Sequence, residues 1–415
     1  MGTFHDELQV FLNSVCVGTL CQDNGAMSFS YAPEYLQAKD AYPLSLNLPL
    51  TDGVFHDPVV ENFLSNLLPD ERVRTTVARV LGVSADNTFG LLKRIGADCA
   101  GAVSFYPPGQ SPQSMTTPVY RELNEDDAYS ILDNLFLRPL DVGDEGVRIS
   151  GAGSQEKLVA CIRGGRVFLP LYGTPSTHII KPELPAFPGS VFNEFFCMRL
   201  ARECGLPVAD CRLFMLKEEP FYVVTRFDRE EVGGVLLRLH QEDFCQLLNI
   251  PSKLKYEEEG GPGVEDCLRR MTEMQLPDED KMRFLNLLMF NFLIGNCDAH
   301  AKNYAVLYRE GRPSLAPAYD LLSTMVYDFI VKRFAMGICG ERRMGALRQS
   351  HFAEQAKSCG LDSSQVVCEL VQLAERLPAT AQKLMEELDA FHPSDIYRRI
   401  VWEIRRNCRQ MLEET

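Results

Sequence analysis

Short strand-like patterns and one long helical pattern share the first 107 residues of the chain. Alternating apolar and polar positions predict strands at residues 8–13, 16–20, 27–32 and 101–107. Residues 57–82, DPVVENFLSNLLPDERVRTTVARVLG, have apolar positions at helical spacing and are predicted to be helical. We therefore expect a first domain over residues 1–107 that combines a small β-rich unit with helices.

A change in composition marks the end of this domain. Residues 107–118, PPGQSPQSMTTP, are rich in Pro, Ser, Thr and Gln and have no periodicity, which indicates a linker. A short helical pattern, NEDDAYSILDNLF, follows at residues 124–136. We assign residues 108–145 to this linker and short helix.

Strands dominate residues 146–230, which we expect to form a β-rich lobe. Residues 157–173 predict a hairpin that turns at a Gly-Gly pair, and strand patterns recur at 177–183 and 222–229. The one helical pattern of this lobe is SVFNEFFCMRLARECG, in which Ser190 is a possible N-cap and Gly205 marks the stop.

After residue 240 nearly every pattern is helical. The most apolar run is FLNLLMFNFLI at residues 284–294, and GNCDAHAKNYAVL follows it directly. Burial of the Asp, His, Lys and Asn side chains of this second stretch without hydrogen-bond or ion-pair partners would be unfavourable. The exception is the hairpin-like stretch at residues 303–320. We expect a mostly helical lobe over residues 231–415, and therefore an α+β fold in three parts.

The charge balance argues against direct binding of nucleic acid. The 415 residues carry a formal net charge of −15, whereas sequence-independent binding needs a surplus of Lys and Arg. The basic stretch RRIVWEIRRNCR, residues 398–409, is typical of one charged helix face. Any contact with DNA is therefore expected to run through a partner.

The sequence also argues against a membrane anchor and a secreted scaffold. No stretch reaches the roughly 18 uninterrupted apolar residues of a membrane span, and the start, MGTFHDELQV, fits neither a secretory signal nor N-myristoylation. The 14 cysteines include no CxxC pair and lie mostly inside apolar patterns, as small buried residues in a reducing compartment do. We expect a soluble, cytoplasmic protein with no membrane partner.

A lobe of strands with one helix, joined to a helical lobe, is typical of a protein-kinase-like two-lobe fold. Phosphoryl transfer needs cradled phosphates, Lys and Mg²⁺ to neutralise charge, and an attacking hydroxyl held in line. These parts should follow one another in a fixed order along the chain.

The first candidate parts lie in the β-rich lobe. The segment RISGAGSQEKL, residues 148–158 and here called the glycine loop, places two glycines ahead of a strand, where backbone N–H groups could approach phosphates. Its spacing is not that of a Walker P-loop, and an ordinary glycine turn is the alternative. Lys181 then closes a strand and Glu194 follows on the one helix. Such a pair would hold the ammonium against the α/β-phosphates, although each residue alone is typical of a surface.

The next parts lie in the helical lobe. Asp298 and Asn303 are five positions apart, the spacing that a kinase catalytic loop uses between its base and its metal-binding Asn. The predicted hairpin then delivers Asp320, where a second Mg²⁺ ligand belongs. Helix capping would explain either aspartate alone, but not the spacing, the hairpin and the upstream Lys together. Lys302 could steady the transferring phosphate, and His300 is expected to hydrogen-bond the backbone or Asp320.

These residues resemble the HipA toxins, serine/threonine kinases of bacterial HipBA toxin–antitoxin systems. The resemblance is carried by RISGAGSQEK, YGTPSTHIIKP, NEFFCMRLARECGL, VTRFDR, QEDFCQLLNIPSKLKYEEEGGPG, IGNCDAHAKNYAV and APAYDLLS. In the first domain it is carried by FSYAPEYL, YPLSLNLPL, NFLSNLLPDE and IGADCAGAVSFYP, which are similar to the HipA N-terminal domain. It covers about residues 1–330, with a looser helical match beyond.

The resemblance implies an ATP- and Mg²⁺-dependent protein kinase that phosphorylates translation machinery, notably aminoacyl-tRNA synthetases, and so arrests growth. A HipB-like helix-turn-helix antitoxin would hold it in check and would supply the contact with DNA. By position, Lys181 would be the phosphate lysine, Asp298 the base, and Asn303 and Asp320 the metal ligands. ATP would be bound by Gly151, Ala152, Gly153, Ser154, Gln155, Lys157, Lys181, Thr225, Arg226, Phe227 and His300, with Thr225 to Phe227 at the adenine hinge.

Ser150 falls where the family's autophosphorylated serine lies, and a phosphate there would expel the glycine loop and switch the enzyme off. Ser154 is a second candidate, because Gly151 and Ser154 depart from the family pattern around Gly153. The stretch KYEEEGGPG fits an ordered loop and a plain surface loop equally.

Two other functions stay open at this point. The chain could serve as a catalytically weak nucleotide-binding corepressor that grips an antitoxin, or as a kinase for a small molecule. The complete base and metal positions favour a protein kinase over the first, and the long first domain favours it over the second.

Overall fold

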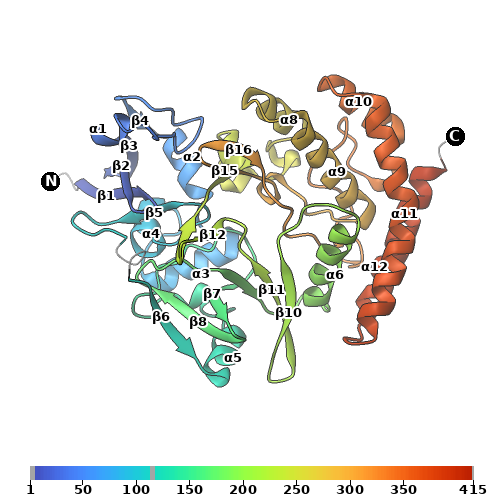
Figure 1. The fold of residues 1–415 in the computed structure, drawn as a ribbon, viewed down its shortest axis with the longest axis horizontal. Coiled ribbons are helices and arrows are strands. Elements are labelled where there is room, and N and C mark those ends of the chain that lie inside the picture. Colours follow the sequence, from blue (N-terminus) through green and yellow to red (C-terminus); the bar gives the residue numbers. More distant parts are fainter. Residues whose placement is uncertain (1–4, 113–116, 414–415) are drawn as a thin grey trace.

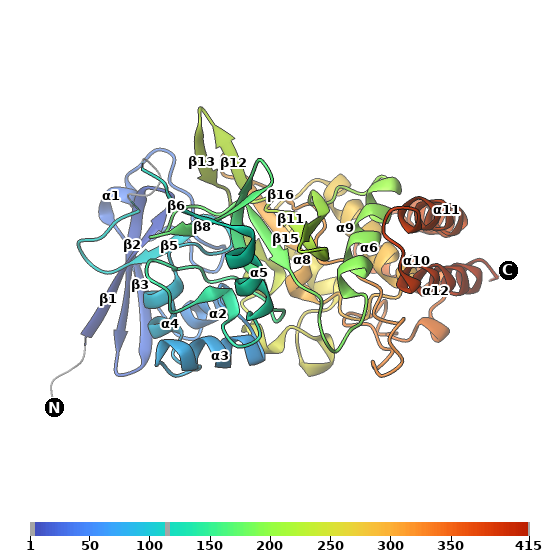
Figure 2. The same ribbon diagram turned by 90° about the horizontal axis from the view of Figure 1, so that it is seen from below.

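Strands and helices are both abundant in the computed structural model, which describes residues 5–112 and 117–413 (Figures 1 and 2). Within these residues the strands form sheets of five, six, three and two members, and the long helices gather in the C-terminal half. The predicted α+β fold is confirmed. Residues 113–116 of the predicted linker lie outside the described residues.

The N-terminal domain is built on a five-stranded antiparallel sheet in the order β4-β3-β2-β1-β5. Its strands are β1 (His5–Leu12), β2 (Val15–Asp23), β3 (Ala26–Tyr31), β4 (Val54–His56) and β5 (Val103–Tyr106). Its helices are α1 (Pro33–Leu36), α2 (Val59–Ser65), α3 (Glu71–Leu81) and α4 (Thr88–Ile95). Apolar side chains of the sheet and the helices share one buried core.

The helical stretch predicted over residues 57–82 is present, and it consists of two helices, α2 and α3. Pro69 lies between them, and a proline inside a helix lacks the N–H and collides with the preceding turn. Asp70 then becomes the N-cap residue of α3, but its side chain makes no capping hydrogen bond. That side chain is directed instead toward the other lobes.

Six strands form the sheet of the β lobe, in the order β10-β11-β9-β7-β8-β6. They are β6 (Val119–Leu123), β7 (Leu158–Arg163), β8 (Arg166–Leu171), β9 (His178–Lys181), β10 (Cys211–Leu216) and β11 (Glu219–Thr225). The predicted hairpin is confirmed as β7–β8, whose turn uses Gly164 and Gly165 at φ 56° and 77°. Strand β6 is not predicted from the sequence, since only its last residue is buried, and pairing with β8 holds it in place.

Two predicted helices accompany this sheet, α5 (Glu125–Asp133) and α6 (Ser190–Glu203). The N-cap of α6 is Gly189 at φ 78°, so the prediction for Ser190 is wrong. The Ser190 hydroxyl instead accepts a hydrogen bond from the Leu184 N–H at 2.8 Å. Helix α6 packs against β10 and β11 on one side and against the last two long helices on the other.

The helical lobe surrounds α9 (Asp278–Ile294), the apolar helix expected from the sequence. Almost every residue from Phe284 onward is buried, as expected for a helix that is apolar on all sides. The surrounding helices are α7 (Phe244–Leu247), α8 (Val264–Glu273), α10 (Gln349–Ser358), α11 (Ser363–Asp389) and α12 (Asp395–Leu412). Helices α11 and α12 form the edge of the molecule farthest from the N-terminal domain (Figure 1).

This lobe is less helical than predicted. The expected hairpin is confirmed as β15 (Ala305–Arg309) and β16 (Arg312–Leu315), and β14 (His240–Asp243) extends it to three strands. A separate ribbon joins β12 (Arg229–Val232) and β13 (Val235–Arg238). Residues 316–348 form no α-helix and only one 3₁₀ turn, Met344–Ala346. Proline and several glycines interrupt this segment and disfavour a continuous helix.

Several properties expected from composition are present. All 14 cysteines are free, and 12 of them are buried or partly buried. On α12, Ile400, Ile404 and Cys408 are buried, while the arginines of the basic stretch are exposed and form one charged face. Among the helices of the described residues, none is both long and apolar enough to cross a lipid bilayer.

Side-chain amides of the N-terminal domain dock it onto the helical lobe. Asn47, Asn62 and Asn66 donate to backbone carbonyls of residues 246–250 at 2.8–3.0 Å. Gln246 and Leu247 are the last residues of α7, and Asn249 and Ile250 follow it. The last carbonyls of a helix have few partners within it, so these amides supply further hydrogen bonds at the end of α7.

A buried group of charges forms a second interdomain contact, here called the Asp98 cluster. Asp98 of the N-terminal domain is fully buried and contacts Arg229 at 2.8 Å, Arg238 at 3.0 Å and Arg226 at 3.5 Å. Asp228 supplies a second carboxylate, 2.8 Å from Arg226 and 2.9 Å from Arg229. Burial alone would raise the pKa of Asp98, but the three arginines outweigh it and hold that pKa well below its ordinary value.

Candidate active site

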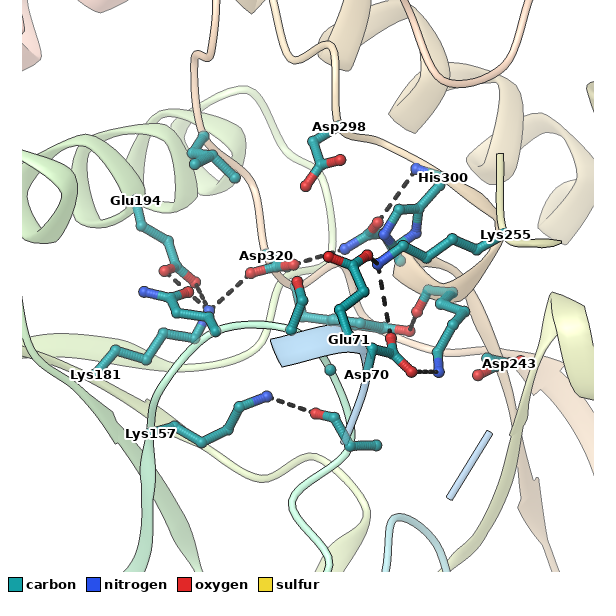
Figure 3. A pocket seen from close by; sticks show the side chains of 18 of the residues that line it. Asp70, Glu71, Lys157, Lys181, Glu194, Asp243, Lys255, Asp298, His300 and Asp320 are labelled. Carbon is teal, nitrogen blue, oxygen red and sulfur yellow. Dashed lines mark hydrogen bonds and ion pairs between the residues drawn. The ribbon is translucent and has the colours of Figure 1, made fainter. Parts of the chain in front are cut away.

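A cleft of about 1040 Å³ lies where the β lobe, the helical lobe and the N-terminal domain meet (Figure 3). Its volume is at the upper end of the range for small-molecule sites, roughly 300–1000 Å³. Every site residue predicted from the sequence lines this cleft, with the exception of Ser150. Asp298 and Asp320 therefore face the same space, as the catalytic hypothesis requires.

The cationic centre of the cleft is Lys181 at the end of β9. Its Nζ lies 2.8 Å and 3.0 Å from the two carboxylate oxygens of Glu194 on α6, and 2.7 Å from Oδ1 of Asp320. Burial disfavours the ammonium, but these carboxylates outweigh it and raise the pKa of Lys181 above its ordinary value. The sequence-predicted Lys–Glu pair is thus formed, and the ammonium stays charged at the bottom of the cleft.

Residues 295–303, here called the catalytic loop, follow α9 directly. The contacts at this junction explain why an apolar helix ends in polar residues. Gly295 ends the helix at φ 74°, and Met325 leaves almost no room for a Cβ there. Asn296 then donates to Asn291 Oδ1 at 2.8 Å and accepts the Asp298 N–H at 3.1 Å. These amides satisfy one another and connect the rigid helix to the loop that carries Asp298.

Asp298 is the carboxylate of the catalytic loop that faces the cleft. Its Oδ1 accepts a hydrogen bond from the Tyr256 hydroxyl at 2.7 Å. Burial raises the pKa of this carboxyl to about 6, and the hydrogen bond opposes the shift. A carboxylate with a pKa near 6 is ionised at pH 7 and still basic enough to accept a proton from a hydroxyl group in a transition state.

Asn303 of the catalytic loop lies against Asp320, which follows the β15–β16 hairpin. Asn303 Nδ2 donates to Asp320 Oδ2 at 2.6 Å, and Asp320 adopts the left-handed φ of 59° that few non-glycine residues occupy. Burial would raise the pKa of Asp320, but Lys181 outweighs it and lowers that pKa to about 2. The strained backbone of Asp320 points its charged carboxylate into the cleft.

The pair formed by Asn303 and Asp320 has the chemistry of a partial magnesium site. Asn303 Oδ1 accepts the His300 N–H at 3.2 Å in the present structure, and Mg²⁺ prefers a few amide and carboxylate oxygens together with phosphate oxygens. In the described part of the chain, no three His, Cys, Asp or Glu side chains gather as metal ligands. The residues therefore fit a cation that arrives with phosphates, and they do not form a closed protein site.

Two predicted side-chain roles differ from what the structure shows. The Lys302 ammonium is buried and pairs with Oδ1 of Asp70 at 3.0 Å, so it is not free to meet a phosphate. The His300 ring makes no hydrogen bond to Asp320 through Nδ1, which is buried without a partner among the described residues. Burial, followed by Lys255, lowers the pKa of His300 to about 3, so the ring is neutral.

Residues 151–157 of the glycine loop line one wall of the cleft. Gly151 has φ 52°, and a Cβ there would lie 2.2 Å from Leu140; Gly153 has φ 108°. Lys157 donates to the carbonyl of Ala152, and burial followed by the charge of Lys181 lowers the pKa of Lys157 to about 8. These contacts show why glycine is required at position 151, where side chains could not fit.

The N-terminal domain holds this loop from outside. Pro69 and Gly153 form a parallel β-bridge in which the Asp70 N–H donates to the Gly153 carbonyl at 3.1 Å. Ser150 is fully buried, and its N–H donates to the Asp98 carbonyl at 3.2 Å. The exposed Ser154 and the neighbouring Gln155 line the cleft directly.

The three residues predicted to form the hinge, Thr225 to Phe227, line the cleft, but the side chain of Arg226 points elsewhere. Thr225 ends β11, and the ring of Phe227 lies 5.4 Å from that of Tyr319 at the cleft wall. The Arg226 guanidinium enters the Asp98 cluster instead. Only the backbone of Arg226 is therefore placed to meet a ligand.

Sequence reasoning missed three residues that complete the site, Asp70, Lys255 and Tyr256. The Lys255 ammonium is 3.1 Å from Glu71 and 3.7 Å from Asp70, so the stretch KYEEEGGPG is an ordered part of the cleft and not a plain surface loop. The available signals were the resemblance of NFLSNLLPDE and of KYEEEGGPG to one family. Neither segment shows a spacing that would reveal its contact with the catalytic loop.

Comparison with known proteins gives a consistent result. The family model for the HipA N-terminal domain matches residues 8–106, and that for the HipA-like C-terminal domain matches residues 149–386. Protein Y4mE of Sinorhizobium fredii is 37% identical over 402 residues, which are 94% of this chain and 93% of that protein. The serine/threonine-protein kinase toxin HipA of Shewanella oneidensis is 32% identical over 388 residues, 89% of this chain and 87% of the toxin.

A solved structure is similar over nearly the whole chain. It is that of the Shewanella oneidensis toxin–antitoxin complex of HipA, HipB and operator DNA, with a TM-score of 0.85 and 28% identity. The match covers 98% of this chain and 97% of the chain in that structure.

Proposed function

The chain belongs to the HipA family, and on that premise we propose that it is an ATP-dependent serine/threonine protein kinase of a toxin–antitoxin system. The observation that carries the proposal is the convergence of Lys181, Asp298, Asn303 and Asp320 on one cleft. These four residues come from three separate segments, and their side chains are those that phosphoryl transfer requires.

The chain's own residues would act as follows. Lys181, held by Glu194, binds the nucleotide phosphates; Asn303 and Asp320 would hold Mg²⁺, which neutralises phosphate charge when it is bound. Asp298 accepts the proton of the acceptor hydroxyl as its oxygen attacks the terminal phosphorus, and the bond from that phosphorus to the nucleoside diphosphate breaks. The glycine loop and the hinge after β11 position the nucleotide.

Labelled ATP tests this proposal directly. The purified protein, incubated with Mg²⁺ and ATP labelled on the γ-phosphate, should transfer label to itself or to a protein of a bacterial lysate, and excess EDTA should abolish the transfer. The physical reason is that Mg²⁺ neutralises the phosphate charge, and two protein side chains would not keep the cation from EDTA. If neither the protein nor any lysate protein takes up label, the kinase proposal is wrong.

We propose that Ser150 is the site of self-phosphorylation and that the glycine loop must leave its present position first. Ser150 is fully buried here, whereas Ser154 is exposed. A phosphate carries close to two negative charges and cannot share the space that Ser150 now occupies. Phosphopeptide mapping after incubation with ATP should find the label on Ser150, and Ser150→Ala should lose it. Retention of the label in Ser150→Ala, together with its loss in Ser154→Ala, would assign the site to Ser154.

We further propose that a HipB-like helix-turn-helix antitoxin binds this chain and carries it to DNA. Two observations support this partner: the similar solved structure contains HipB and operator DNA, and the net charge of −15 disfavours direct contact with phosphates. A translation-related protein, such as an aminoacyl-tRNA synthetase, is the proposed substrate class. Phosphoproteomics after induction of the chain would identify the acceptor.

A further inference from the structure

Tyr256 reaches the catalytic loop from a segment 42 positions earlier in the chain. Its hydroxyl donates to Oδ1 of Asp298 at 2.7 Å, and both side chains line the same cleft. A carboxylate has two oxygens, and only the one that faces the acceptor can take its proton. The Tyr256 contact leaves Oδ2 for that purpose.

Several contacts keep the Tyr256 phenol in place. Its ring meets the His300 ring edge-on at 5.2 Å, and its carbonyl accepts the Gly261 N–H at 2.9 Å. A Cβ at Gly261 would lie 2.1 Å from the Leu254 carbonyl oxygen, so the loop can close tightly only with glycine there. The neighbouring Lys255 is anchored by its ion pairs to the N-terminal domain. The phenol is therefore fixed before any ligand binds.

We propose that Tyr256 is a positioning residue: its hydroxyl fixes the rotation of the Asp298 carboxylate so that Oδ2 faces the acceptor hydroxyl. The Asp298 backbone is already held by Asn296, and the side-chain rotation is the freedom that remains. A pre-oriented base avoids the loss of rate that a small misplacement causes. The inference rests on the proposed kinase function only in naming the acceptor.

The hydrogen bond between Tyr256 and Asp298 can be measured through the pKa of Asp298, which several neighbouring charges also affect. Burial raises the pKa of Asp298 most, the Tyr256 hydrogen bond lowers it, Asp320 and Glu71 raise it, and Lys255 lowers it. Removal of the phenol hydroxyl removes a stabilising contact of the charged form. The pKa of Asp298 should then rise above its present value of about 6.

Tyr256→Phe keeps the ring and deletes the hydroxyl. We expect kcat for phosphoryl transfer to fall roughly 10-fold or more, since a hydrogen bond to a charged group is lost, while KM for ATP stays near the wild-type value. The acid limb of the pH–rate profile should move to higher pH. The matched control is Tyr129→Phe on α5, which deletes a phenol bonded to the Glu219 carboxylate at 2.8 Å, and it should leave the profile unchanged.

A second measurement separates this inference from the proposed function. In ¹³C-carboxyl-labelled protein, the Asp298 signal is the one that Asp298→Asn removes, and its titration should shift to higher pH in Tyr256→Phe. If the wild type transfers no phosphate but this shift occurs, the kinase proposal fails and the contact stands. An unchanged titration and pH profile, a rise in kcat, or phosphate mapped to Tyr256 itself would each overturn the positioning role.

Discussion

Asp298→Asn should lower the rate of phosphoryl transfer by about 10²–10⁴-fold, the contribution typical of a general base. The amide oxygen can still accept the Tyr256 hydrogen bond, and the loop geometry should persist. What is lost is a group that takes the acceptor's proton. Nucleotide affinity should change little, because Lys181, Asn303 and Asp320 are untouched.

The measurement is the initial rate of label transfer, with ATP binding followed separately by calorimetry. Asp133→Asn, an exposed aspartate on α5, is the matched control and should transfer at the wild-type rate. Equal rates in wild type and Asp298→Asn would remove Asp298 from the mechanism. Loss of ATP binding in Asp298→Asn would mean that the substitution damages the cleft and not the chemistry.

The largest effect on stability is expected from Asp98→Asn. All three arginine side chains are buried, and this change leaves Asp228 to pair with Arg226 and Arg229 while Arg238 loses its carboxylate. Breaking a buried ion pair from one side typically costs 3–5 kcal/mol, so we expect the free energy of unfolding to fall by about that amount. Chemical denaturation followed by circular dichroism measures the difference.

Asp210→Asn is the matched control for this experiment. Asp210 pairs with Arg202 at 2.9 Å, but its side chain is 72% exposed, and an exposed pair contributes about 0–1 kcal/mol. The low pKa of Asp98 gives a second test: its stabilising effect should be present above pH about 4 and be lost as the pH falls toward the folded-state pKa. Equal losses in Asp98→Asn and Asp210→Asn would show that the cluster is not a special source of stability.

Local sequence patterns predicted those parts of the site that depend on local structure. The apolar run of α9 and the spacing of Asp298 and Asn303 are set by one helix and the loop that follows it. The hairpin that delivers Asp320 depends on two short strands and a turn. Such features depend only on residues that are close together in the chain, so they can be predicted from periodicity and from turn residues.

Contacts between distant segments could not be predicted in the same way. Asp70 meets Lys302 across 232 positions, and Asp98 meets Arg238 across 140. No periodicity in either segment records its partner. Pro69 is an instructive case, because the break that it causes between α2 and α3 also directs Asp70 toward the cleft.

The β-bridge between Pro69 and Gly153 has a consequence for how fast a ligand binds and leaves the cleft. On the proposed function, a nucleotide that binds beneath the glycine loop enters and leaves past this backbone hydrogen bond to another domain. The residence time of bound nucleotide should therefore depend on how firmly residues 5–106 are seated, and substitutions far from the phosphates can set the rate of product escape.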